Sequence, residues 1–125
     1  MDPIAEMFSQ IKNAQSVRRE KLIISYSKIK LAILEILKLH HQIIDYRLLK
    51  KQHDESQKIE INLKPNLIDI KRISRPGRRV YTSGSSIPRP KRPQSMVIIS
   101  TSQGVLEGEE ARKKGLGGEL IAEIR

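Results

Sequence analysis

Apolar residues near the start of the chain recur at the spacing of two helices. Between residues 4 and 14 they form one stripe, after an Asp2-Pro3 pair suited to a helix start. The polar stretch 15–21 ends this helix. Ser27 is a candidate N-cap for a second helix over 28–39, in which Ile and Leu dominate. The first part of the chain therefore predicts two helices with an apolar face.

Three segments around these helices have the pattern of strands. Residues 22–24 form a short apolar run, and 43–49 are a second candidate. Residues 58–63 alternate strictly, as expected of a strand with one face in water. The polar stretch 50–57 separates the last two as a hairpin loop, and Pro65 marks a domain boundary.

The rest of the chain is rich in predicted strands. They cover residues 67–73, 79–82, 96–99 and 120–124. Pro76-Gly77 is a turn, and the Pro-containing stretch 83–95 is a loop. A short helix over 109–114 has acids first and bases last, and Gly115 suits its C-terminal cap. We therefore predict an α+β protein of two small domains. Residues 1–65 hold two helices and a three-stranded sheet, and residues 66–125 are β-rich with one short helix.

Charge adds a partner to this picture. The chain carries +10, from 24 Lys and Arg against 14 Asp and Glu. Between Lys64 and Ser95 there are nine basic residues and one acid, Asp69, so this stretch carries +8 and the remainder only +2. Charge gathered in one segment indicates a polyanion such as a nucleic acid. The alternative is a soluble protein that is basic for no binding reason.

The residues offer little for catalysis. The chain has no cysteine, which excludes disulfides and thiolate sites. His40 and His41 are adjacent, so they cannot share one helix face as metal ligands. Glu109 and Glu110 are more simply partners of a helix dipole. The glycines of 115–118 follow a helix, whereas a phosphate loop precedes one. We predict no catalytic residue, no metal, no cofactor and no small-molecule substrate.

The start of the chain lacks the layout of a secretory signal, and no apolar run reaches the roughly 20 residues of a membrane span. We expect a soluble, intracellular protein without a membrane partner. Aromatic residues make up only 3% of the chain, too few for the stacking platforms of a single-strand binder. Folded RNA, recognised by its backbone and groove shape, is the better match.

The segment Ser100-Thr101-Ser102-Gln103-Gly104 follows an apolar strand directly. Its three hydroxyls can each donate and accept, and glycine allows a turn with positive φ. Such a loop can address ribose hydroxyls, phosphates and minor-groove base edges. From the residues alone, a plain serine-rich turn is the simpler interpretation.

Several segments of the chain, including residues 99–105, match in their order the motifs of a known protein family. They are Asp2-Pro3-Ile4-Ala5, Ser27-Lys28-Ile29-Lys30, Ile73-Ser74-Arg75-Pro76-Gly77-Arg78-Arg79-Val80-Tyr81, Ile99-Ser100-Thr101-Ser102-Gln103-Gly104-Val105 and Ala111-Arg112-Lys113-Lys114-Gly115-Leu116-Gly117-Gly118-Glu119. Together they resemble the bacterial-type ribosomal protein family known as small-subunit protein eight. The resemblance spans essentially the whole chain.

This resemblance implies a two-domain α+β protein of the small ribosomal subunit. It would bind the central domain of small-subunit rRNA and support subunit assembly, next to neighbouring small-subunit proteins. The ribosome would be that of a bacterial cytoplasm or of an organelle. Binding to its own messenger RNA, as a translational regulator, is an alternative. An RNA-modifying enzyme is a third hypothesis that the lack of ligand clusters disfavours.

The residues expected to contact rRNA come mainly from the second domain. The hydroxyl segment would enter a minor groove with Glu119 beside it, and the basic residues would meet phosphates. The full set is Ser100, Thr101, Ser102, Gly104, Glu119, Lys28, Lys30, Arg75, Arg79, Tyr81, Arg89, Lys91 and Arg92. Tyr81 has two interpretations, a base-stacking residue or a core residue with its hydroxyl at the rim.

The sequence departs from the family pattern in three places. A basic, proline-rich stretch, 88–95, replaces a glycine-rich turn, and we expect it to add phosphate contacts. His40-His41-Gln42 replaces a Gly-aromatic pair after the second helix. The end, 122–125, lacks the aromatic residue that is common there, which leaves the packing of this end open.

Overall fold

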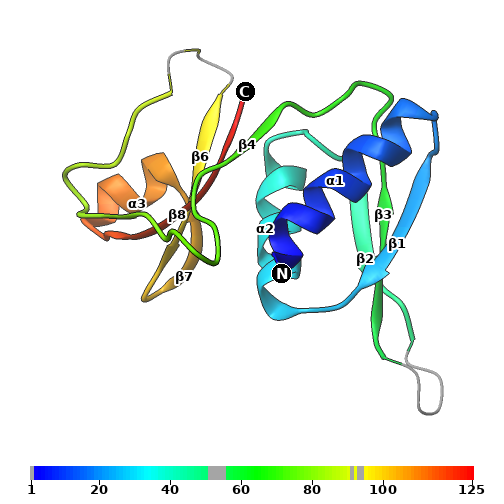
Figure 1. Ribbon diagram of the computed structural model, residues 1–125, viewed down its shortest axis with the longest axis horizontal. Coiled ribbons are helices and arrows are strands. Elements are labelled where there is room, and N and C mark those ends of the chain that lie inside the picture. The colour runs from blue at the N-terminus through cyan, green and yellow to red at the C-terminus, as the bar shows by residue number, and fades with distance from the viewer. Residues whose placement is uncertain (1, 51–55, 91, 93–94) are drawn as a thin grey trace. The chain divides into compact units, whose positions relative to one another are not determined.

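The computed structural model describes residues 2–50, 56–90, 92 and 95–125. Within these ranges the chain forms three helices and two antiparallel sheets, so the predicted α+β class is confirmed. Contacts divide it into two compact units, Pro3–Ile68 and Asp69–Arg125 together with Asp2. We call them the N-terminal and C-terminal units and describe each by itself (Figure 1).

The N-terminal unit consists of two helices and a three-stranded sheet, as predicted. Its elements are α1 (Pro3–Ser16), β1 (Lys21–Ser25), α2 (Lys28–Leu39), β2 (Asp45–Leu48) and β3 (Lys58–Asn62). The strand order is β1-β3-β2, with both neighbours antiparallel to β3. Helix α1 contacts β1 and α2 contacts β2 (Figure 1). The proposed hairpin loop 50–57 lies largely outside the described residues.

Local chemistry explains the bounds of these helices. The Ser27 hydroxyl accepts a hydrogen bond from the Lys30 amide at 3.2 Å, which confirms the predicted N-cap. Helix α1 continues through Gln15, which the sequence had placed in the polar stretch that ends it. The Gln15 side chain is buried and bonds the Lys64 carbonyl at 3.1 Å and the Ile68 amide at 3.0 Å. It thereby fastens the segment after β3 to α1.

The sheet of this unit has an apolar face and a polar face. Ile59 and Ile61 are fully buried, whereas Glu60, between them, points to the other face. The Glu60 carboxylate lies 3.3 Å from Arg47 and 3.7 Å from Lys21, its cross-strand neighbours. The hydrogen bond from Arg47 holds the pKa of Glu60 below its usual value, and the charge of Lys21 adds to this.

The C-terminal unit is a five-stranded sheet with one short helix. Its elements are β4 (Ile70–Arg72), β5 (Tyr81–Thr82), β6 (Met96–Thr101), β7 (Gly104–Glu107), α3 (Gly108–Lys114) and β8 (Gly118–Ile124). The order is β4-β8-β6-β7. Strand β5 also pairs with β8, at Gly118 and Glu119, which precede the residues of β8 that pair with β4. Strand β8 therefore holds the sheet together, since it pairs with three others.

Two predicted strands of this unit are shorter than expected. Of 67–73, β4 covers only Ile70–Arg72. Before it, the Ile68 amide bonds the Gln15 side chain instead of a strand, and after it the Ile73 amide still bonds the Ile121 carbonyl of β8 at 3.0 Å. Of 79–82, β5 covers only Tyr81–Thr82. The Val80 amide is held by the Ser74 hydroxyl at 2.8 Å, although the Val80 carbonyl accepts from the Leu120 amide of β8 at 2.9 Å. Strand β7 was not predicted, since four residues with one polar end give no clear alternation.

Helix α3 covers one face of this sheet. Its cluster of buried residues contains Ile87, Val97, Ile99, Ala111 and Leu120. The helix ends at Gly115 with φ 68°, the left-handed cap that the sequence predicted. Alternation along β6 places Ile99 toward this core and Ser100 on the opposite face.

Candidate nucleic-acid interface

The hydroxyl segment, which the sequence predicted as a loop after the strand 96–99, is largely part of a tight β-hairpin. Ser100 and Thr101 belong to β6, Gly104 begins β7, and only Ser102 and Gln103 form the turn. Pairing with β7 and β8 continues past Ile99, which gives these residues a fixed backbone. Gly104 has φ 109°, a conformation that side chains other than hydrogen rarely permit. The hydroxyls are therefore presented by a rigid element.

The three hydroxyls of this hairpin have different roles. The Thr101 hydroxyl donates to the Gly104 carbonyl at 2.8 Å and accepts from the Gln103 amide at 3.1 Å, so it closes the turn. The hydroxyls of Ser100 and Ser102 have no hydrogen-bond partner in the part of the chain that is described. Ser102 is exposed and Ser100 is half-buried. Two hydroxyls are thus available to a ligand and the third positions them.

Glycines allow three segments to meet beside the hairpin. A Cβ added at Gly118 would lie 2.0 Å from the Ser100 carbonyl oxygen, and one at Gly117 would lie 2.4 Å from the Thr82 carbonyl oxygen. A Cβ at Gly84 would lie 2.6 Å from the Gly115 backbone. No real side chain fits at such distances, so these glycines are required for close approach. From the sequence, the pair Gly117-Gly118 was rejected as a nucleotide motif and used within the last family motif, but this close backbone approach was not predicted.

A row of side chains crosses the sheet next to the turn. Tyr81 of β5 pairs with Glu119 of β8, which pairs with Ser100 of β6. Directly opposed residues project to the same face, so these three lie side by side. Glu119 accepts from Arg79 at 3.1 Å, which neutralises its charge. We call Tyr81, Glu119, Ser100 and Ser102, with Arg79, the hydroxyl end of the sheet.

Tyr81 is 66% exposed, so the alternative of a core tyrosine is wrong. Its position depends on Ser74, which is completely buried and bonds both the amide and the carbonyl of Val80. The turn before it is closed by two reciprocal backbone bonds between Arg75 and Arg78. Stacking of a base on Tyr81 and phosphate contacts by Arg75 stay predictions.

The remaining predicted residues lie elsewhere. Arg89 and Arg92 are exposed on the segment before β6, which is the other end of that strand from the hairpin. Lys91 lies outside the described residues. Lys28 is exposed at the first position of α2 in the N-terminal unit.

Lys30 does not have the exposed ammonium that the sequence reasoning assumed. It is 9% exposed, and its Nζ donates to the Ser25 hydroxyl at 2.9 Å and to the Ser25 carbonyl at 3.3 Å. The ammonium thereby links the start of α2 to the end of β1. A charge held by internal acceptors is a weak candidate for a phosphate contact, so we leave Lys30 out of the interface.

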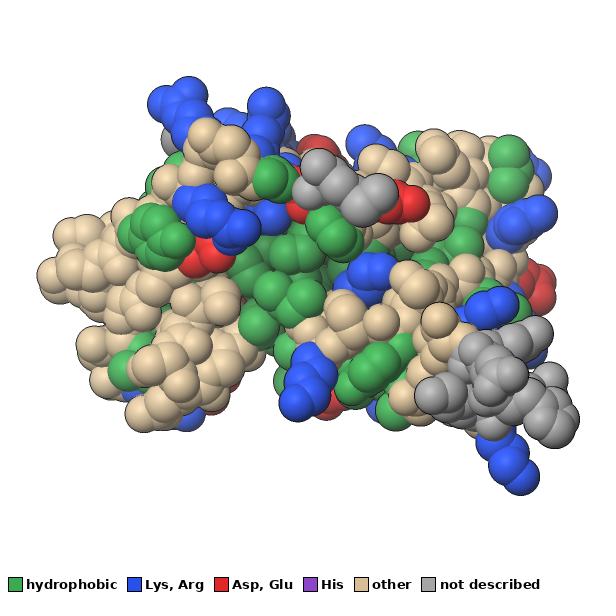
Figure 2. Space-filling view, turned by 60° about the horizontal axis from the view of Figure 1, so that its bottom comes forward, with side chains coloured by type: hydrophobic (Ala, Val, Ile, Leu, Met, Phe, Trp, Pro, Cys, Tyr) green, Lys and Arg blue, Asp and Glu red, His purple; other side chains and the backbone are tan. Residues whose placement is uncertain are grey.

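The C-terminal unit has a face that is rich in backbone and uncharged polar groups. Figure 2 shows the visible face of the C-terminal unit, at the left, mostly in the colour of these groups, with Lys and Arg gathered toward its upper rim. This arrangement provides donors and acceptors over much of the face and positive charge along one side of it. Folded RNA, with ribose hydroxyls between phosphates, has the complementary pattern.

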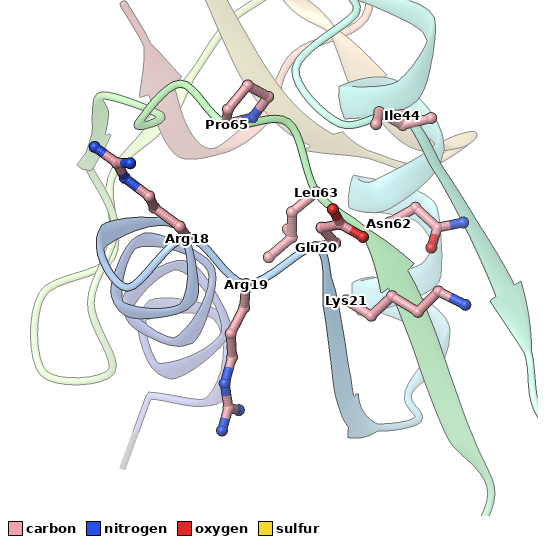
Figure 3. A pocket seen from close by; sticks show the side chains of 8 residues that line it. All are labelled: Arg18, Arg19, Glu20, Lys21, Ile44, Asn62, Leu63 and Pro65. Atoms are coloured by element: carbon pink, nitrogen blue, oxygen red, sulfur yellow. The ribbon is translucent and has the colours of Figure 1, made fainter.

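The N-terminal unit contains a cavity of about 700 Å³. Its lining is Arg18, Arg19, Glu20, Lys21, Ile44, Asn62, Leu63 and Pro65. In Figure 3 the arginines of the turn after α1 point away from one another, and Leu63 points between the walls. The lining has one carboxylate and no hydroxyl, thiol or imidazole, so it offers no nucleophile with a neighbouring base.

The described ranges hold no group of three or more His, Cys, Asp or Glu that could bind a metal ion. His40 and His41 are exposed after α2, and His53 lies outside the ranges that are described. Within the same limits, no helix has the length and apolar character needed to cross a membrane.

Comparison with known proteins identifies the family. The family model described as Ribosomal protein S8 matches residues 2–124. The small ribosomal subunit protein uS8 of Geobacillus stearothermophilus is 45% identical over 126 residues, covering 98% of this chain and 96% of that protein. The uS8 proteins of Mycoplasmopsis pulmonis and Tropheryma whipplei are 42% and 38% identical, with 98% and 97% of this chain and 96% and 95% of those proteins covered. The resemblance inferred from the motifs is confirmed, and the chain belongs to the ribosomal protein S8 family.

Proposed function

We propose that this protein is a structural constituent of the small ribosomal subunit and that it binds small-subunit rRNA through the hydroxyl end of its C-terminal sheet. Membership of the S8 family carries the ribosomal role, the binding of small-subunit rRNA and the contact with other ribosomal proteins. The protein is not an enzyme, since the family is one of ribosomal structural proteins. Its location is the ribosome.

The single observation that supports the hydroxyl end as the RNA contact is the pair of free hydroxyls on a rigid hairpin. Ser100 and Ser102 are held by β6, by the Thr101 turn and by the contact with Gly118. Because the backbone is fixed before binding, the cost of ordering these hydroxyls on RNA is small. Hydroxyls read ribose and base edges in a shallow minor groove, where long cationic side chains only track phosphates.

Glu119 gives this surface selectivity. A carboxylate repels phosphate but accepts hydrogen bonds from a ribose 2′-OH or a base amino group. Arg79 Nη1 lies 3.1 and 3.3 Å from the two carboxylate oxygens, which removes most of the repulsion, and each oxygen keeps a second lone pair that can still accept a hydrogen bond. The surface therefore favours RNA whose groove brings donors to this point and disfavours a plain row of phosphates.

Two finer assignments belong to the same proposal. The rRNA site lies in the central domain of the small-subunit rRNA, as the motifs suggested. The ribosome is that of a bacterium or an organelle, and the bacterial relatives agree with the first. Protection of rRNA nucleotides by the bound protein locates the site, and protection confined to another rRNA domain would contradict it.

Binding of Ser102→Ala to a small-subunit rRNA fragment tests the interface. Loss of a hydroxyl that meets an otherwise unpaired RNA group should cost about 1–3 kcal/mol. The variant should bind an unrelated RNA duplex as well as the parent protein does, at equal salt. Ser9→Ala, which removes an exposed hydroxyl from α1, is the matched control and should change neither affinity. An equal loss on both RNAs would show that the hairpin does not discriminate.

A further inference from the structure

A second concave site lies in the C-terminal unit, away from the hydroxyl end. It is a hollow of about 500 Å³ whose described lining is Lys71, Pro88, Arg89, Arg92, Ser95, Glu123 and Arg125. These residues come from β4, from the segment before β6 and from the end of β8. We call this hollow the basic groove.

The basic groove contains more positive charge than its own acids neutralise. Four cationic side chains face one carboxylate, which gives a side-chain charge of four minus one, or +3. Glu123 pairs with Arg125 at 3.4 Å. The side chains of Lys71, Arg89 and Arg92 have no hydrogen bond or ion pair with any described residue. Three of the four cations therefore converge here without an ion-pair partner among the described residues.

Such a groove has one obvious class of ligand. Cations that line a concave surface reinforce one another's potential and attract a polyanion. Guanidinium groups hold phosphate oxygens with two hydrogen bonds each, and the ammonium of a lysine adds a compact charge. The Ser95 hydroxyl, half-buried in the same wall, supplies a neutral donor.

The basic groove and the hydroxyl end are at opposite ends of the same sheet. Strand β6 runs from Met96, next to the groove, to Thr101 in the hairpin. Six steps from Ser95 to Thr101, at about 3.3 Å each, separate the two sites by roughly 20 Å. In Figure 1 the β6–β7 hairpin lies at the bottom of this unit and the C-terminus at its top. One phosphate group cannot serve both sites.

We propose that the basic groove is a second RNA contact, which holds the phosphate backbone about 20 Å from the hydroxyl end. The inference rests on the proposed function, because it assumes that the hydroxyl end also lies on RNA. It adds Lys71 and Arg125, which were not in the set of residues expected to contact rRNA, to Arg89 and Arg92, which were. The C-terminal unit then binds RNA at two points, one that discriminates and one that fixes its direction along the RNA.

Charge removal in the groove tests the new residues. Lys71→Gln with Arg125→Gln should weaken binding to the rRNA fragment roughly three- to tenfold at moderate salt. It should also flatten the dependence of log K on log salt by about one to two units, since two phosphate contacts disappear. The control is Lys12→Gln with Lys58→Gln, which removes the same charge from exposed positions of the N-terminal unit. Equal effects of both pairs would overturn the proposal, because net charge alone would then explain them.

Glu123→Gln tests the effect of adding positive charge to the basic groove. It frees Arg125 and raises the side-chain charge of the groove by one, so binding should tighten about two- to threefold, and the salt dependence should steepen. Affinity that is unchanged or weakened would count against phosphate in the groove.

RNA cleavage by an iron chelate attached to the protein tests the basic groove separately from the proposed function of the hydroxyl end. Since the chain has no cysteine, Ser95→Cys and Gln103→Cys each give a single point for attaching an iron chelate that cleaves nearby RNA. Cleavage from both positions, at two separate sets of nucleotides, is the expected result. Cleavage from residue 103 alone would overturn the basic groove and leave the hydroxyl end intact. Cleavage from residue 95 alone would overturn the proposed function and, with it, the two-point arrangement.

Discussion

The two sheets of this protein differ in the partners of the acid on their polar faces. On the polar face of the N-terminal sheet, Glu60 lies between Lys21 and Arg47 and is neutralised within the unit. On the C-terminal sheet, Glu119 has one cation, Arg79, and its neighbours are a hydroxyl and an exposed tyrosine. A sheet surface that is complete in itself needs no partner. A sheet surface that presents free hydroxyls beside an acid paired with a single arginine is suited to bind a partner.

The close backbone approach at Gly118 gives the largest expected effect. Gly118→Ala should destabilise the C-terminal sheet by about 3 kcal/mol or more, because the new Cβ would lie 2.0 Å from a backbone oxygen that cannot turn aside. Chemical denaturation measures the loss. Gly77→Ala, where an added Cβ meets nothing within 4 Å, should change stability by less than about 0.5 kcal/mol. Equal stabilities for the two variants would contradict the close packing of the hydroxyl end.

The buried hydroxyl of Ser74 comes next. Ser74→Ala removes the partner of the Val80 amide, 2.8 Å away, and should cost about 1–2 kcal/mol. The N-terminal unit has no part in this contact. Amide hydrogen exchange should therefore become faster at Val80 and in β5 and stay unchanged in β1 to β3. Unchanged protection of Val80 would show that the hydroxyl does not hold this segment.

Replacing the arginine that pairs with each of these two glutamates compares the two sheets directly. Arg79→Gln leaves Glu119 without its cation, and RNA binding should weaken by up to about 1 kcal/mol. Arg47→Gln leaves Lys21 for Glu60, so RNA affinity should not change. Adding Glu119→Gln to the Arg79 variant should recover the loss that comes from repulsion. The comparison fails if the two single variants bind rRNA equally.

The smallest effect is a dependence of stability on acid. The pKa of Glu60 is lowered in the folded protein, so the unfolded chain takes up its proton first as pH falls. The contribution is complete above the usual value of 4.5 and is lost as pH falls below it. Glu60→Gln should therefore flatten the fall in melting temperature below pH 4.5. An identical pH profile for the variant would show that Glu60 does not contribute to the loss of stability in acid.

Much of the fold could be predicted from local patterns, and the exceptions have physical causes. Helix α2 begins and ends where Ser27 and the Ile/Leu stripe indicated. Strand β7 could not be seen, because its pairing with β6 depends on a turn closed by Thr101. Gln15 was assigned to a polar helix end, although its amide is buried against a segment about fifty residues away in sequence. Single-sequence patterns do not contain such distant partners.

Most residues of the site could be chosen from the sequence, but their contacts could not. The hydroxyls and Glu119 were chosen by motif, and strand pairing places Ser100 and Glu119 side by side. That Thr101 is occupied within its own turn could not be known without the register of the hairpin. Lys30 was chosen by charge, and burial against Ser25 gives it an internal role. Lys71 and Arg125, far apart in sequence, meet Arg89 and Arg92 only because β4 and β8 pair.

A structure of this protein on small-subunit rRNA tests the central claim most directly. The hydroxyls of Ser100 and Ser102 should lie within hydrogen-bond distance, about 2.7–3.2 Å, of ribose hydroxyls or base edges of a folded RNA helix. Thr101 should keep its bond to Gly104. Ser100 and Ser102 facing solvent or a protein neighbour, with RNA only on other parts of the chain, would contradict the account.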